Sequence, residues 1–190
     1  MKKWNIRKLC LWAGAGLIAA AVAILGIWQW NIHAAQSQME TCVSSLRALM
    51  PEPRNAAVEA RRDNTMPVLS LDGTDYIGIL EMPSYGSALP VQAQWGSVTQ
   101  SPCFYGGSAY DGTLQIGATS QTGQYDFYQE LSVGDGVYFT DMAGNRYSYT
   151  VTNLHYAEHA DRTSLEKNPG NLILFIKNIY DRQYLIVTCG

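Results

Sequence analysis

The hydrophobic pattern begins with an unbroken apolar run over residues 9–30, which contains no charged side chain. Four basic residues precede it: Lys2, Lys3, Arg7 and Lys8. A helix of this length spans about 33 Å, which is enough to cross a hydrocarbon core of about 30 Å. No Lys or Arg follows until Arg47, so the positive-inside rule places residues 1–8 in the cytoplasm and the rest of the chain outside. We predict a single-pass transmembrane signal anchor over residues 9–30. A cleaved signal peptide fits less well, because its apolar core is shorter and "NIHAAQSQ" is a poor cleavage site.

The next segment, residues 31–73, is predicted to be a helical stalk or linker. Apolar side chains recur at helical spacing along one face of its first part: Met39, Cys42, Val43, Leu46, Leu49 and Met50. Pro51 and Pro53 should end this helix. The apolar face predicts that the helix lies on the following domain or pairs with a second copy of the chain.

From residue 74 to residue 190 the pattern changes to short alternating stretches. Apolar residues occupy every second position on both sides of the turn "MAGN": Val137, Phe139, Tyr147, Tyr149 and Val151. The runs "NLILFI" and "YLIVTC" are the last two strand candidates, and "DRTSLEKN" before them is a plausible short helix. Seven or more short strands, separated by turns rich in Gly and Pro, predict an all-β domain built as an antiparallel barrel or sandwich.

Composition narrows the functional classes. The formal net charge is −3, and without the four basic residues before the anchor the exported part is near −7, which argues against a nucleic-acid partner. The chain has no CxxC, HExxH, P-loop or Gly-rich dinucleotide motif, so we expect no metal and no cofactor. Its histidines are His33, His155 and His159, and the last two are the only ones in the predicted β region that could act as an acid or base.

The β region resembles the sortases, which are membrane-anchored cysteine transpeptidases of Gram-positive cell surfaces, and most nearly their class B-like branch in Firmicutes. The resemblance runs from about Tyr76 to the end of the chain. "YIGILEMPSYGSALPV" is similar to the opening strand of the family, and "SPCFYGGSAYDGTLQIGATS" to the segment before the catalytic histidine. "FYQELSVGDGVYFTDMAGNRYSYTV" resembles a hairpin with characteristic Gly-Asp, Phe, Asp, Gly and Tyr positions, and it is the most specific part.

The resemblance implies a closed eight-stranded barrel with short helices and a three-residue catalytic site. In the family a Cys thiolate attacks the peptide bond of a sorting signal, a His acts as the acid, and an Arg stabilises the oxyanion. The strand "LQIGATS" matches the histidine strand without a gap, and this places Thr119 at the position of the histidine. Because a Thr hydroxyl neither gives up nor takes up a proton near neutral pH, the family's acid is missing from this position.

Two alignments of the last two strands place the nucleophile differently. In one, "YLIVTCG" carries it at Cys189, but the chain then stops without the closing strand, and His155 or His159 would have to be the acid. In the other, "NLILFIK" is the penultimate strand, so that Lys177 holds the nucleophile position and Tyr184 the position of the arginine. Arg182 could take the arginine's role only if the hairpin shifted. We favour the second alignment because it completes the barrel and leaves no exposed edge.

Further hypotheses depend on these alignments. Cys103 and Cys189 either form a disulfide or are two separate buried thiols. A Thr119–Lys177 catalytic pair is conceivable only if the Lys is buried, and the simpler interpretation is a solvated Lys in a degenerate cleft.

For the function we expect a noncatalytic sortase-like protein on the outer side of the cell membrane, anchored by residues 9–30. Its partner would be a sorting-signal peptide, a surface protein or a true sortase. The alternatives are an active cysteine transpeptidase that uses Cys189, and a structural stalk-and-barrel subunit of a surface assembly.

Overall fold

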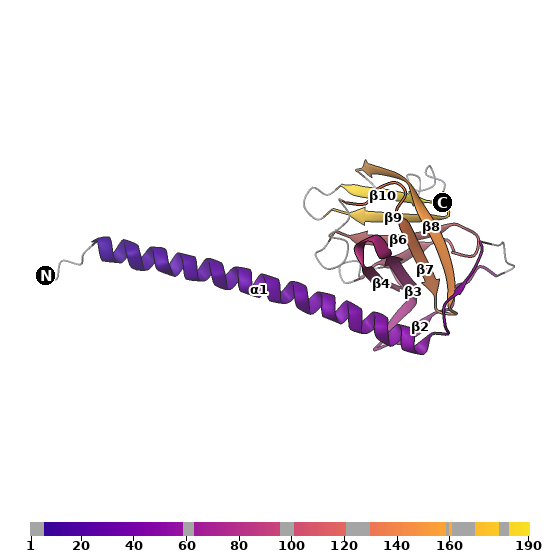
Figure 1. Cartoon of the computed structure of the whole chain (residues 1–190), viewed down its shortest axis with the longest axis horizontal. Helices are drawn as coiled ribbons and strands as arrows, with labels where there is room; N and C mark the ends of the chain where they lie inside the picture. The colour runs from indigo at the N-terminus through magenta and orange to yellow at the C-terminus, as the bar shows by residue number, and fades with distance from the viewer. Residues whose placement is uncertain are drawn as a thin grey trace.

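The structure is a computed structural model that describes residues 6–58, 63–95, 101–120, 130–158, 160, 170–178 and 183–190. It consists of a long N-terminal helix, α1 (Ile6–Leu49), followed by a β-barrel (Figure 1). The predicted short helix "DRTSLEKN" lies outside the described residues.

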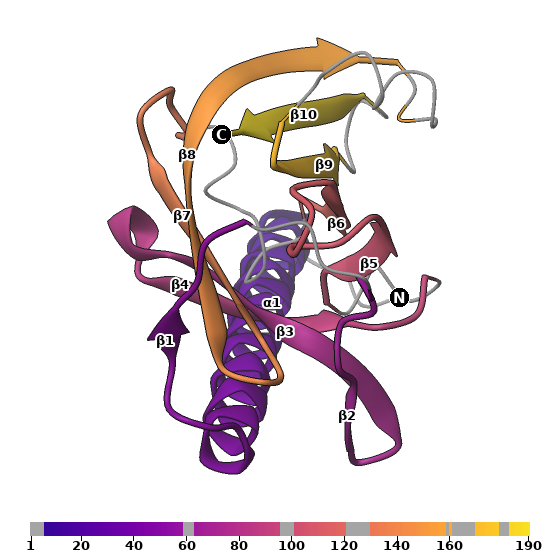
Figure 2. The ribbon, with the colours of Figure 1, turned by 90° about the vertical axis from the view of Figure 1, so that its right-hand side faces the viewer.

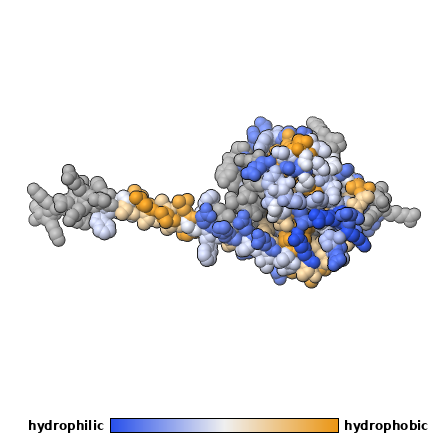
Figure 3. Space-filling model, in the orientation of Figure 1, coloured by the Kyte–Doolittle hydropathy of each residue, from blue (hydrophilic) through white to orange (hydrophobic). Residues whose placement is uncertain are grey.

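Helix α1 crosses the predicted boundary between anchor and stalk without a break, because no Pro or Gly lies between Trp30 and Leu49. It ends at Leu49, shortly before Pro51, as predicted. The first part of α1 carries an apolar band that projects beyond the barrel (Figures 1 and 3). The helix is long and apolar enough to span a membrane. None of its most apolar stretch is buried against the rest of the molecule.

The barrel is a closed ring of eight strands, in the order β3, β4, β5, β6, β9, β10, β8, β7 and back to β3 (Figure 2). Its strands are β3 (Thr74–Met82), β4 (Ser87–Gln92), β5 (Cys103–Gly106), β6 (Leu114–Thr119), β7 (Gly136–Asp141), β8 (Asn145–Ala157), β9 (Leu172–Lys177) and β10 (Tyr184–Cys189). Two short strands, β1 (Arg54–Asn55) and β2 (Leu69–Leu71), flank the ring, and a 3₁₀ turn, η1 (Pro83–Tyr85), joins β3 to β4.

The ring is mixed rather than purely antiparallel, which corrects the prediction from sequence. β4 pairs with β5 in parallel, and β6 pairs with β9 in parallel. The β7–β8 hairpin lies between β6 and β9 in the chain but on the other side of the ring, so that β9 returns beside β6 in the same direction. Such a pairing depends on long-range contacts that hydrophobic alternation does not reveal.

The barrel interior is filled by the inward side chains of the strands. The five alternating residues predicted from the β7–β8 hairpin are all buried in one core cluster, which confirms this part of the pattern. Leu172, Leu174 and Ile176 of β9 belong to the same cluster. Each such side chain contributes about 1.5–3 kcal/mol on burial, so the interior is the main source of stability.

The last turns of α1 pack on the outside of the barrel. Val43 and Leu46 are buried there together with Tyr76, Ile79 and Met142. The apolar face predicted for the stalk helix therefore lies on the domain. This contact joins the helix to the barrel next to β3 and β4.

Candidate functional site

Three residues that are far apart in the sequence lie in one row at the ends of neighbouring strands. Thr119 at the end of β6 is in register with Lys177 at the end of β9, and Lys177 is in register with Tyr184 at the start of β10. Adjacent strands lie about 4.8 Å apart, so Lys177 is a direct neighbour of both Thr119 and Tyr184. We call this set the strand-end row. The structure thus brings together the three positions that the resemblance had singled out.

The strand-end row lies on the outer face of the barrel. The residues next to it in each strand, Ala118, Ile176 and Leu185, belong to the interior core, and side chains alternate between the two faces of a strand. Within the row, Thr119 is buried, Tyr184 is half-buried and Lys177 is exposed. The row therefore contains a buried hydroxyl, a half-buried phenol and an exposed ammonium group.

An aromatic platform lies beside the row on the same face. It consists of Trp95, Tyr105 and Phe175, whose ring centroids are 5.0–5.5 Å apart. The platform rests on Gly117, where an added Cβ would lie 2.4 Å from Trp95 Cζ3 and 2.5 Å from Phe175 Cε2. Only glycine permits this close approach. Because Trp95 is 50% exposed and Tyr105 is 37% exposed, the platform is an apolar surface open to solvent.

Sequence reasoning missed this platform. Trp95 belongs to a loop, and nothing in the alternation of the strands links it to β6. The one available signal was the glycine inside "LQIGATS", because a glycine within a strand often marks the close approach of another group.

Cys189 lies away from the strand-end row in two respects. It is at the other end of β10, five residues or about 17 Å along the strand from Tyr184, and it is in register with Leu172. Its side chain points into the core and is fully buried. Burial raises the pKa of the Cys189 thiol to about 12. Since the thiolate is the nucleophile, this environment opposes a catalytic role.

The histidines do not complete a catalytic site in the part of the chain that the structure describes. His155 on β8 is in register with Ile186 and shares the outer face with Ala157, whereas Cys189 points inward. His155 and Cys189 therefore lie on opposite sides of the sheet. The Nδ1 atom of His155 is buried and has no hydrogen-bond partner among the described residues. His159 and Arg182 lie outside the described residues.

The disulfide considered from the sequence is not formed. Cys103 and Cys189 are both buried thiols, on strands β5 and β10, which are separated in the ring by β6 and β9. The Cys103 thiol instead donates to the Ser101 carbonyl oxygen at 3.4 Å and to Gln92 Oε1 at 3.7 Å. Of the two alternatives, separate buried thiols is the one observed. In the described part of the chain no group of three His, Cys, Asp or Glu side chains is arranged to hold a metal ion.

The closed eight-stranded barrel has the sortase fold, as its likeness to solved structures shows. The chain is similar to sortase C1 from Streptococcus agalactiae, with a TM-score of 0.52 and 16% identity over 64% of this chain and 69% of that chain. It is also similar to sortase C1 from Streptococcus suis, with a TM-score of 0.50 and 18% identity over 60% of this chain and 72% of that chain. No family model and no curated protein matches the chain.

The resemblance to sortases predicted from the sequence is thereby confirmed at the level of the fold. At these identities the likeness carries over neither activity nor substrate. Both neighbours are named sortase C1, so the class B-like assignment stays a prediction.

Proposed function

We propose that this chain is a membrane-anchored, noncatalytic protein of the sortase fold, which binds a peptide on the outer face of β6, β9 and β10. The peptide would be a sorting signal or a related segment of a surface protein. The observation that carries the proposal is the chemistry of the strand-end row. It holds Thr119, Lys177 and Tyr184, where transpeptidation would need an imidazole, a thiol and a guanidinium, respectively.

None of the three row residues can replace its counterpart in the reaction. A hydroxyl is not a proton donor for a leaving amine near neutral pH, and a phenol carries no positive charge for an oxyanion. Catalytic lysines are activated by burial, whereas Lys177 is exposed. The exposed ammonium group of Lys177 and the half-buried phenol of Tyr184 can form hydrogen bonds with a peptide, which is what binding requires.

The aromatic platform supplies the apolar half of a peptide site. An extended peptide that lies along the strand ends could place an apolar side chain on Trp95 and Tyr105, both of which are partly exposed. Its backbone would meet the polar groups of the strand-end row. Apolar contact combined with a few fixed polar groups is the usual composition of a ligand site.

The anchor in this proposal is the apolar part of α1. Basic residues precede it and the barrel follows it, so the positive-inside rule places the barrel outside the cell membrane. The exposed apolar band on α1 (Figure 3) is the surface that lipid would cover.

Covalent trapping combined with a binding assay tests the proposal. The reduced full chain in detergent is incubated with LPxTG-like and NPxTN-like peptides that carry a thiol-reactive group at the scissile position, and adducts are mapped by mass spectrometry. We expect no peptide-dependent adduct. Unreactive peptides of the same sequence should bind saturably, and Tyr105→Ala should weaken their binding, whereas the matched control Tyr156→Ala should not.

Two results would contradict the proposal. A peptide-dependent adduct on Cys189 would support the active transpeptidase. A folded protein that binds neither peptide would favour a purely structural subunit.

A further inference from the structure

A concave site lies on the other side of the barrel from the strand-end row. It is a groove of about 360 Å³ between the end of α1 and the outer face of β3, β7 and β8. In the ring of eight strands, β7 lies opposite β6 and β3 lies opposite β9. The two sites are therefore separate, and a ligand in the groove is independent of the proposed function. We call this second site the arginine groove.

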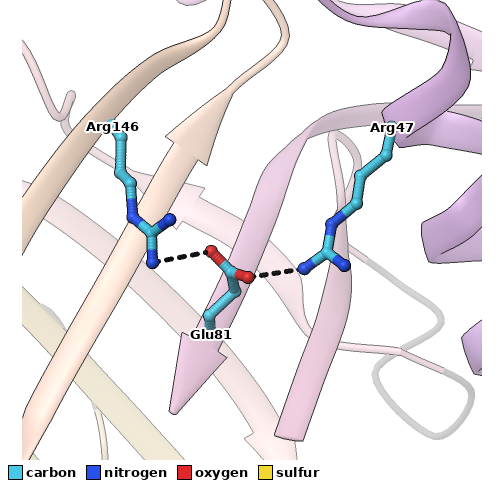
Figure 4. Close-up of polar contacts among 3 residues, drawn as sticks. All are labelled: Arg47, Glu81 and Arg146. Atoms are coloured by element: carbon cyan, nitrogen blue, oxygen red, sulfur yellow. Dashed lines mark hydrogen bonds and ion pairs between the residues drawn. The ribbon is translucent and has the colours of Figure 1, made fainter. Parts of the chain in front are cut away.

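The centre of the arginine groove is one carboxylate shared by two guanidinium groups (Figure 4). Glu81 on β3 accepts from Arg47 Nη2 at 2.5 Å through one oxygen and lies 3.3 Å from Arg146 Nη2 through the other. Each guanidinium has five N–H donors, and the contact with Glu81 uses one nitrogen of each, so most of the donors can still bind another acceptor. The triad retains one excess positive charge. Arg146 also lies 4.3 Å from the ring centroid of Tyr138, which fixes the plane of its guanidinium group.

A third donor that lines the groove is the hydroxyl of Thr140 on β7. The side chain of Thr140 is 3% exposed, and its Oγ1 atom makes no hydrogen bond in the part of the chain that the structure describes. Buried hydroxyl groups are normally paired, because an unpaired one loses its hydration without compensation. Thr140 is in register with Arg146 across β7 and β8, and both residues line the groove.

The remaining lining residues set the size and the polarity of a ligand. Met50, Pro51 and Ile79 form an apolar wall, and Glu52 contributes an exposed carboxylate. The groove thus has unused N–H donors of Arg47 and Arg146 in one part and the carboxylate of Glu52, which is outside the triad, in another. Its volume is at the small end of the range for ligand sites, about 300–1,000 Å³.

We infer that the arginine groove binds a small zwitterion of the amino-acid class. The ligand's carboxylate accepts hydrogen bonds from Arg47, Arg146 and the Thr140 hydroxyl. Its ammonium group faces Glu52, and its aliphatic part lies against Met50 and Ile79. The ligand's carboxylate is then paired with the two guanidinium groups and its ammonium group with a carboxylate, and the Thr140 hydroxyl gains a hydrogen-bond acceptor.

A titration followed by nuclear magnetic resonance tests this inference on the full chain in detergent micelles. The probe is alanine, and the readout is the Nε–H resonance of Arg146 in ¹⁵N-labelled protein. Acetate and methylamine, which each carry only one of the two charges, are titrated separately. We expect a saturable shift with alanine and an affinity at least about tenfold weaker for each single-charge probe, equivalent to about 1.4 kcal/mol.

Two variants and two matched controls locate the site. Thr140→Val should raise the Kd for alanine about fivefold, the effect of one hydrogen bond, and it should still fold because the hydroxyl has no partner among the described residues. Arg146→Gln, read through the Arg47 resonance, should raise the Kd more than tenfold. Thr150→Val and Arg54→Gln make the same chemical changes at residues that do not line the groove, and they should leave the Kd unchanged.

Three outcomes would overturn the inference. They are the absence of a saturable shift with alanine, acetate binding as tight as alanine binding, and an unchanged Kd in folded Thr140→Val.

Discussion

The reactivity of Cys189 is a direct measure of whether this barrel can perform cysteine chemistry. Burial raises the pKa of its thiol from 9.0 to about 12, a difference of three pH units. At pH 7.5 the thiolate fraction is therefore about 1,000-fold lower than for a thiol with the ordinary value, because each unit is a factor of ten. A thiolate of higher pKa is intrinsically more nucleophilic, and over three pKa units this raises the rate constant of the thiolate about 20-fold. The net expectation from ionisation alone is a reaction about 50-fold slower.

Burial of the side chain slows the reaction further. Cys189 has no exposed surface, so a reagent must wait for the closing strand to open locally. We expect Cys189 to react with an aromatic disulfide reagent at least 50-fold more slowly than Cys42, which is only half-buried on α1. Cys42 thus serves as the reference thiol within the same molecule.

The assay is timed labelling of the reduced protein at pH 7.5, with a mass-spectrometric map of each thiol at each time point. In denaturant Cys42 and Cys189 should react at similar rates, which would show that the difference arises from the fold. If Cys189 in the native protein reacts within about tenfold of the Cys42 rate, the reasoning from burial is refuted. The alignment that makes Cys189 the nucleophile would then regain its support.

The structure makes four other predictions. The folded thiol of Cys189 stays protonated up to about pH 12 while the unfolded one ionises near 9.0, so its contribution to the free energy of unfolding should fall by about 3 kcal/mol from pH 9 to 12. Urea titrations of Cys189→Ala should show a smaller loss over the same pH range. Gly117→Ala should destabilise the barrel by about 1–3 kcal/mol in thermal or urea unfolding, because its Cβ would clash with the aromatic platform, whereas Gly136→Ala, which has open space, should not. Leu46→Ala should cost about 2–5 kcal/mol and make the end of α1 sensitive to limited proteolysis, and intact resistance would contradict the packing. Lys177→Met should leave any peptide hydrolysis unchanged; its abolition would support a catalytic Thr–Lys pair.

The fold was predictable where the pattern is local. The alternation from Val137 to Val151 identified the β7–β8 hairpin, and the helical spacing of Val43 and Leu46 identified the face of α1 that packs on the barrel. The parallel pairing of β6 with β9 was not predictable, because it joins strands with a whole hairpin between them in the chain.

The sites were less predictable than the fold. Glu81, Arg47 and Arg146 look like ordinary surface charges in the sequence, since the three are widely separated and no motif links them. Only the packing of α1 against β3 and the pairing of β7 with β8 bring them into one groove. In the same way, Trp95 reaches β6 through a loop, and the hydrophobic pattern says nothing about where a loop returns.

The position of Cys189 is a consequence of the closure of the barrel. The sequence left two alignments open, and they differ in which strand closes the ring. In the structure β10 pairs with β9 on one side and with β8 on the other, so it is the closing strand and no edge is exposed there. Since side chains alternate along β10, placing Tyr184 on the outer face requires Cys189, five residues later, to point inward. A catalytic Cys189 would therefore need a register shift of one residue, and this shift would turn Leu185 and Val187 out of the core.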